Sequence, residues 1–161
     1  MLKLLRVDDR LIHGQVTFSW LSATGAKRII VANDKFATNK MLKMSLTVGK
    51  PSGVDLQILE KSKAISLIKA KGGSKTMLIV KDIQDAYDIY LGLKDDLHDI
   101  CLGGVREEPG RKLVAKQVYL SEDDIKLLKE MVNAGKNVFA QDVPIVAAAS
   151  FDEIISKFNE R

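Results

Sequence analysis

The residues best suited to carry out a reaction lie close together near the N-terminus. Asp8, Asp9, Arg10 and His13 occupy a short polar segment between the first apolar run and the next amphipathic stretch. A neutral imidazole is a nucleophile at cell pH, a carboxylate can hold its tautomer, and a guanidinium can neutralise an anionic group during its transfer. The segment therefore indicates transfer of an anionic group to His13. Either aspartate could supply the supporting carboxylate.

His13 also stands directly before a stretch that is predicted to be helical. The first N–H groups of a helix have no intrahelical acceptor, and together with the helix dipole they attract anions. Gly14 would let the backbone approach such an anion closely. We therefore predict a phosphate at this helix start, and phosphoryl transfer without a protein-bound metal. The structural alternative is that an aspartate caps the helix, Arg10 is a surface charge, and His13 packs or faces solvent.

The elements that must position this segment alternate along the chain. Short β-branched runs alternate with amphipathic stretches, which is typical of a parallel sheet with helices on both faces. Strands are predicted at residues 2–7, 28–32, 54–59, 77–80, 100–102, 118–120 and 137–140. Helices are predicted to start near residues 14, 36, 62, 83 and 122, with a last one at 151–158. We expect one α/β domain over residues 1–161, built on an open, mostly parallel sheet of about seven strands.

Single residues mark several of the predicted boundaries. Ser121, followed by three acidic residues, is expected to cap its helix. Gly25, Gly72 and Gly135 are expected to end theirs. Residues 103–116 contain paired glycines, a proline and mixed charges, which leave no room for a crossover helix. The strand that follows is therefore either antiparallel or reached through an irregular loop.

Composition excludes several classes of protein. The 161 residues fit one domain rather than a multidomain enzyme. No apolar run approaches the roughly 20 residues of a membrane helix, and the N-terminus is unlike a signal peptide, so we expect a cytoplasmic protein. One cysteine and two histidines cannot form an ordinary Cys/His zinc site, and we expect neither metal nor cofactor.

The main alternative to an enzyme is a nucleotide- or nucleic-acid-binding module. A formal net charge of +4 is small for a nucleic-acid footprint. Neither G-x-G-x-x-G nor G-x-x-x-x-G-K-[ST] follows any predicted strand. The sequence therefore disfavours this class, and we expect no nucleic-acid partner.

The segment RVDDRLIHGQV, residues 6–16, closely resembles the active-site segment of the IIB subunits of the mannose/sorbose family of the bacterial phosphoenolpyruvate-dependent sugar phosphotransferase system. The resemblance covers nearly the whole chain, through IIVANDKFA, KMSLTVGKPSGV, CLGGVREEPGRK and VYLSEDDIKLLKEMVNAGKNVFAQDVP. It implies that His13 receives a phosphoryl group from a phosphohistidine of the IIA subunit and passes it to the incoming sugar. The acceptor atom is implied to be the ring nitrogen nearer the main chain.

The same resemblance implies supporting residues. Arg10 and Asp8 match the positions that support the histidine, and Gly14 and Gln15 complete its motif. Arg10, Gly14 and Gln15 are thus expected to bind the phosphate. Retention of Arg10 and His13 disfavours a regulatory relative that has lost turnover. A departure occurs at Asn39, where many relatives carry an acidic residue.

The implied partners are the IIA donor, the membrane subunits IIC and IID, and a sugar that the sequence does not identify. The protein is thereby expected at the inner face of the cell membrane, held peripherally through IIC/IID, and a homo-oligomer is left open. Because the chain begins directly at the motif, the donor is expected to be a separate polypeptide.

Other candidate residues are interpreted structurally. His98 is expected on the surface at the amino end of the sheet, and Cys101 as a small apolar strand residue. Phe18 and Trp20 are expected to pack, although one of them could contact a partner. Gly103 and Gly104 are expected to bend the backbone, or else to let it approach the phosphate. Two further expectations are a cap at Asp34 and a weakly positive rim formed by Arg10, Lys35, Lys40, Arg106, Arg111 and Lys112.

Overall fold

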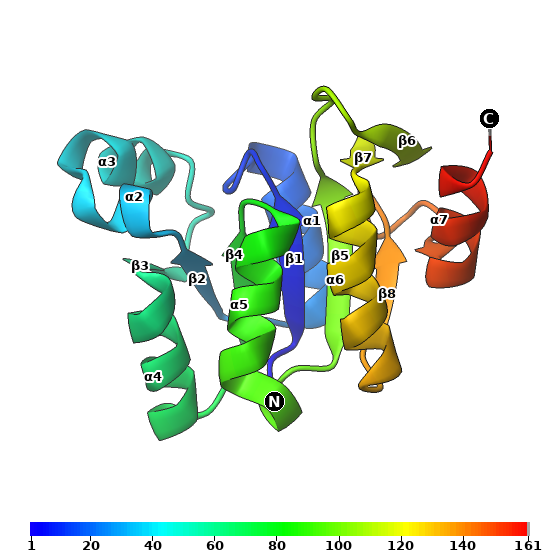
Figure 1. Cartoon of the computed structure of the whole chain (residues 1–161). Coiled ribbons are helices and arrows are strands. Elements are labelled where there is room, and N and C mark those ends of the chain that lie inside the picture. The colour runs from blue at the N-terminus through cyan, green and yellow to red at the C-terminus, as the bar shows by residue number, and fades with distance from the viewer. Residues whose placement is uncertain (161) are drawn as a thin grey trace.

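Seven strands form one sheet, in the order β3-β2-β4-β1-β5-β8-β9, in the computed structural model, which describes residues 1–160 (Figure 1). All neighbouring pairs are parallel except β8 and β9. The strands are β1 (Leu4–Asp8), β2 (Arg28–Ala32), β3 (Asp55–Leu59), β4 (Thr76–Val80), β5 (Asp99–Gly104), β8 (Asn137–Ala140) and β9 (Ala149–Ser150). The expected open, mostly parallel α/β sheet is confirmed.

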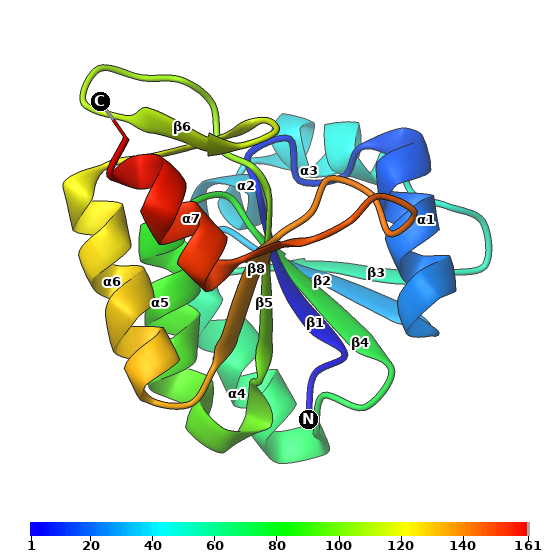
Figure 2. The same cartoon turned by 90° about the vertical axis from the view of Figure 1, so that its right-hand side faces the viewer.

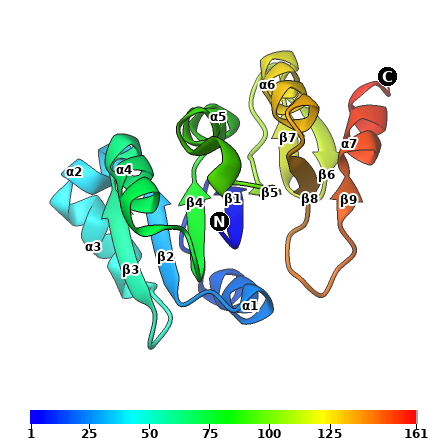
Figure 3. The ribbon, with the colours of Figure 1, turned by 90° about the horizontal axis from the view of Figure 1, so that it is seen from below.

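Helices cover both faces of this sheet. Figure 3 shows α1 on one face and α4, α5 and α6 on the other. Their bounds are α1 (Gly14–Thr24), α4 (Lys61–Lys71), α5 (Ile83–Leu93) and α6 (Glu122–Asn133). The helix α7 (Phe151–Phe158) follows β9, and one 3₁₀ turn, Lys94–Asp96, follows α5. No helix within residues 1–160 is long and apolar enough to cross a membrane.

The alternation of side chains along each strand divides the core into two clusters. In β1, Leu5 and Val7 belong to the larger cluster, on the side of α4, α5 and α6. Leu4 belongs to the smaller cluster with Trp20 of α1. Because side chains alternate faces along a strand, residues 4, 6 and 8 share one face. The polar end of β1 is therefore directed to the α1 side.

The helix expected near residue 36 is two helices, α2 (Asp34–Thr38) and α3 (Lys40–Val48). Asn39 separates them in an extended conformation, with φ −113° and ψ 113°, and its side-chain oxygen accepts the N–H of Leu42 at 3.1 Å. An asparagine that caps the second helix in this way ends the first. Asn39 thus has a local structural role as the cap of α3.

The predicted strand 118–120 lies outside the main sheet. It is β7 (Val118–Leu120), which pairs antiparallel with β6 (Lys112–Ala115) in a separate two-stranded sheet. Figure 2 shows this hairpin beyond the end of β5. Segment 103–116 is thus the end of β5, an irregular loop and β6, so both expected alternatives describe part of it. The seventh strand of the main sheet is instead the two-residue β9, which the sequence pattern does not predict.

The cap at the start of α6 gives a test of the fold. The Ser121 hydroxyl accepts the Asp124 N–H at 3.1 Å, and the Asp124 carboxylate accepts the Ser121 N–H at 3.0 Å. Ser121→Ala should lower the free energy of unfolding by about 1 kcal/mol, and the melting temperature by about 2–4 °C. Thermal unfolding measures this, with the exposed Ser74→Ala as control. Equal melting temperatures in both variants would contradict the assigned cap.

Candidate functional site

The segment from Asp9 to His13 crosses the carboxyl edge of the sheet between β1 and α1. Strand β1 lies between β4 and β5 in the sheet. The chain nevertheless continues from β1 through α1 to β2, which lies on the far side of β4. The strand order therefore reverses at β1, and such a point is where ligands bind in open parallel sheets. The segment from Asp9 to His13 therefore lies where a binding site is expected.

Buried anchors shape this segment. Leu11 is 3% exposed and has φ +59°, and its N–H donates to the Asp8 carbonyl at 2.9 Å. The His13 N–H donates to the hydroxyl of buried Thr17 at 2.9 Å. His13 is thereby fixed as the N-cap residue of α1 while its side chain stays exposed. The first residues of α1, Gly14 and Gln15, are exposed too, and their N–H groups have no acceptor within the helix.

The carboxylate of Asp8 is buried between two guanidinium groups. Its Oδ1 accepts from Arg10 Nε at 2.9 Å and its Oδ2 accepts from Arg10 Nη2 at 2.7 Å. Arg6 Nη2 donates to the same Oδ2 at 3.3 Å. The hydrogen bonds to Asp8 raise the pKa of Arg10 above its ordinary value, the main cause of that shift. Arg10 therefore stays charged, and its Nη1 has no protein partner within residues 1–160.

Arg6 is a further residue of the site, not among those expected from the sequence, and it supports Asp8 from within the core. It is 2% exposed and donates to the carbonyls of Gln141 at 3.0 Å and Asp142 at 2.9 Å. Its guanidinium lies 5.0 Å from the Trp20 ring centre, and the indole N–H of Trp20 donates to the Asp142 carbonyl at 3.0 Å. The signal in the sequence was an arginine in the middle of the buried strand LLRVD.

Asp9 has a different role from Asp8. Its Oδ2 accepts from the Arg106 N–H at 3.0 Å and from Arg106 Nε at 2.9 Å, which ties the loop after β5 to the His13 segment. Neither aspartate bonds the His13 imidazole within the described chain. Asp8 is the carboxylate that positions Arg10.

The two glycines at the end of β5 make room for the charged side chains. A Cβ on Gly103 would lie 2.2 Å from Arg6 Cζ, and one on Gly104 would lie 2.9 Å from Asp8 Oδ1. The register between β1 and β5 also shifts where Asp8 meets Gly104. The expected backbone bend is therefore present as this shift in register. Glycine at both positions lets the side chains of Arg6 and Asp8 approach the backbone closely.

The remaining candidates lie where structural roles suffice. His98 is exposed, next to the amino end of β5 and 3.9 Å from Asp99, and residues 1–160 contain no group of three or more His, Cys, Asp or Glu side chains that could hold a metal. Cys101 is buried, and burial raises the pKa of its thiol to about 11. Phe18 is 56% exposed and lines a hollow beside the segment that follows β8.

Two details differ from the expectations for charged residues. Asn33, not Asp34, caps α2, and Asp34 Oδ1 accepts the Lys61 N–H at the start of α4. The expected positive rim is partly neutralised, because Arg106 pairs with Asp9, and Arg111 pairs with acidic residues. The side chain of Lys112 lies 4.9 Å from the ring centre of Phe158.

Comparison with known proteins identifies the family. The family model described as PTS system sorbose subfamily IIB component matches residues 2–161. The chain belongs to this family. It is similar to the N-acetylgalactosamine-specific phosphotransferase enzyme IIB component 1 of Escherichia coli, with 32% identity over 88% of this chain and 90% of that protein. The crystal structure of the IIBSor domain of the sorbose permease of Klebsiella pneumoniae superposes with a TM-score of 0.87 at 25% identity, over 97% and 96% of the two chains.

A fused relative extends the comparison. The mannose-specific EIIAB component of Escherichia coli is 29% identical over 98% of this chain, which spans 49% of that protein. The family resemblance read from RVDDRLIHGQV is thus confirmed. This PTS IIB component of the mannose/sorbose family takes part in phosphoryl transfer during sugar uptake.

The contact between Gly103 and Arg6 is testable by a double-mutant cycle. Gly103→Ala should destabilise the IIB fold by about 1–3 kcal/mol, because the new methyl group displaces a buried guanidinium. Arg6→Met should cost less in the Gly103→Ala background than in the parent protein. Urea unfolding measures both.

Gly49→Ala is the matched control for this cycle. Its Cβ would meet only ordinary contacts, the nearest at 3.4 Å from Ile12 Cγ2. Additive effects of Gly103→Ala and Arg6→Met would show that the two residues do not share one space.

Proposed function

We propose that this chain is a phosphocarrier that accepts a phosphoryl group from a phosphohistidine of IIA onto His13. The phosphoryl group then passes to a sugar taken up through the membrane subunits IIC and IID. The observation that carries the proposal is an exposed imidazole at the start of α1, three residues after an arginine that a buried carboxylate holds in place. The fused EIIAB relative supports IIA as the donor.

The transfer exchanges one phosphorus–nitrogen bond for another. The lone pair of the His13 ring nitrogen nearer the main chain attacks phosphorus as the bond to the donor imidazole breaks, and the donor nitrogen recovers its lone pair. Such a transfer depends on positioning and on neutralisation of the phosphoryl oxygens. It needs no metal or other cofactor.

Two kinds of donor are available for those oxygens. The N–H groups of Gly14 and Gln15 and the dipole of α1 favour an anion beside His13. Arg10 binds Asp8 through Nε and Nη2, which leaves Nη1 for a phosphoryl oxygen. Asp8 thus acts through Arg10, and Gly14, Gln15 and Arg10 form the phosphate-binding set.

The place of action follows from the proposed acceptor. Because the sugar arrives through membrane subunits, we propose that this chain works in the cytoplasm and meets IIC/IID at the inner face of the membrane. The carboxyl edge of the sheet, which carries His13, would face the donor and the acceptor in turn. Partner exchange at one edge requires the two complexes to be transient.

His13→Ala tests the acceptor. The variant should take up no phosphoryl group from phosphoenolpyruvate, the two general phosphotransferase proteins and candidate IIA subunits, because the nucleophile is gone. Intact mass measures uptake, which in the parent protein should be one group that is lost in mild acid and kept in base. His98→Ala should be labelled like the parent. Label that survives in His13→Ala would refute the assignment.

Arg10→Lys tests the guanidinium. Lysine keeps the charge but cannot bind Asp8 at two points and still offer a third nitrogen to the phosphoryl group. The transfer rate should fall about tenfold or more, and the melting temperature by no more than about 4 °C. Rapid-quench transfer from phosphorylated IIA measures the rate. A variant that unfolds, or that transfers at the parent rate, would contradict this role.

A further inference from the structure

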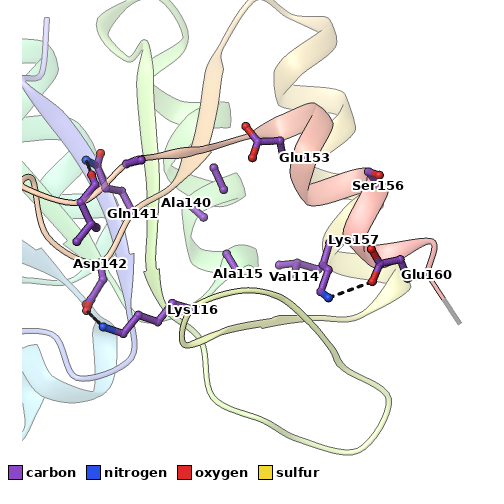
Figure 4. Close-up of a pocket in the computed structure, with 13 residues that line it drawn as sticks. Val114, Ala115, Lys116, Ala140, Gln141, Asp142, Glu153, Ser156, Lys157 and Glu160 are labelled. Carbon is purple, nitrogen blue, oxygen red and sulfur yellow. Dashed lines mark hydrogen bonds and ion pairs between the residues drawn. The ribbon is translucent and has the colours of Figure 1, made fainter.

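Asp142 brings a second carboxylate to Arg10 from the end of β8. Its Oδ1 is buried, has no hydrogen-bond partner within residues 1–160, and lies 3.7 Å from Arg10 Nη2. Its Oδ2 lies 3.5 Å from Lys116 Nζ, and Figure 4 shows these two side chains facing each other beside a cavity of about 420 Å³. The carboxylate is thus close to Arg10 without bonding it.

The backbone of Asp142 is fixed from two sides. Its carbonyl oxygen accepts from Arg6 Nη2 at 2.9 Å and from Trp20 Nε1 at 3.0 Å. The side chain is 11% exposed, so water screens it poorly on the Arg10 side. Its negative charge therefore acts on Arg10 at close range.

The charge of Arg10 is divided between these carboxylates. Hydrogen bonding to Asp8 raises the pKa of Arg10 most, burial lowers it, and the charges of Asp8, Asp142 and Asp9 raise it further. A phosphoryl group on His13 would have to compete with them for the same guanidinium. A carrier must release its phosphoryl group as well as accept it, so strong neutralisation by Arg10 would oppose the second step.

We propose that Asp142 is a positioning residue that sets the phosphoryl-transfer potential of His13, by keeping Arg10 partly neutralised. The inference rests on the proposed function and goes beyond it. Lys116 lies on the other side of the Asp142 carboxylate and reduces its effect on Arg10. Because Lys116 is 72% exposed, its influence is the smaller one.

The two residues predict shifts of opposite sign. Asp142→Asn keeps the shape and removes the charge, so phospho-His13 should become more stable relative to phospho-IIA by about three- to tenfold. Lys116→Gln frees the charge of Asp142 and should shift the ratio the other way, by up to about threefold. A defect that is merely structural slows transfer in both directions and leaves the ratio unchanged.

The experiment mixes purified phospho-IIA, free of phosphoenolpyruvate, with each IIB variant. Intact mass gives the ratio of phosphorylated IIB to phosphorylated IIA at equilibrium, and rapid quench gives the rates of forward and reverse transfer. Glu160→Gln is the matched control, since it makes the same carboxylate-to-amide change at the same cavity, and Glu160 pairs with Lys157 instead of Arg10. Its ratio should equal that of the parent protein.

Each outcome decides a separate question. Shifts of opposite sign in Asp142→Asn and Lys116→Gln, with an unchanged control, support the inference. An unchanged ratio in Asp142→Asn, or shifts of the same sign in both variants, overturns it. If Asp142→Asn does not fold, the substitution Lys116→Gln at an exposed position decides alone. An unchanged or increased ratio of phosphorylated IIB to phosphorylated IIA in that variant overturns the inference. A parent protein that takes no label contradicts the proposed function, and this inference with it.

Discussion

The buried carboxylate of Asp8 is the interaction on which the site depends. A carboxylate removed from water is stable only when it is paired and hydrogen-bonded, and this one is 2% exposed between Arg6 and Arg10. Its Oδ1 also accepts the Arg10 N–H at 3.0 Å. The same carboxylate therefore fixes the backbone after β1 and the direction of the Arg10 side chain. Loss of either arginine would leave an incompletely paired charge in the interior.

This buried charge constrains the surrounding sheet. Arg6 shares the α1 face of β1 with Asp8, and both side chains lie against the end of β5, where Gly103 and Gly104 leave room for them. Arg6 also reaches the carbonyls after β8, and Trp20 reaches one of them from α1. Three strands and one helix thus converge on one guanidinium. These contacts of Arg6 support Asp8 and, through it, the segment that carries His13.

The periodicity of the sequence predicted most elements, because buried parallel strands and amphipathic helices leave strong patterns. The proposed site could be selected because Asp8, Arg10 and His13 are neighbours in the chain. The role of Arg6 could not be predicted, because its hydrogen bonds to Cys101, Gln141 and Asp142 join residues 95 to 136 positions apart. The two-residue β9 is too short to carry a period, and the break at Asn39 rests on one cap. Local patterns therefore gave the elements, and the long-range charges needed coordinates.

The balance of charge around Arg10 bears on the proposed function, in which one imidazole both accepts and releases a phosphoryl group. Arg6 and Arg10 pair with Asp8 and Asp142, so these four residues carry two positive and two negative charges before any ligand arrives, and the exposed Lys116 adds a further cation beside Asp142. An incoming phosphoryl group would therefore meet an Arg10 whose positive charge is already shared with two carboxylates. The N–H groups at the start of α1 would have to supply the rest, and these neutral donors hold an anion without a full charge. Weak, divided neutralisation of this kind suits a carrier, whereas a strongly positive site would suit a protein that keeps its phosphate.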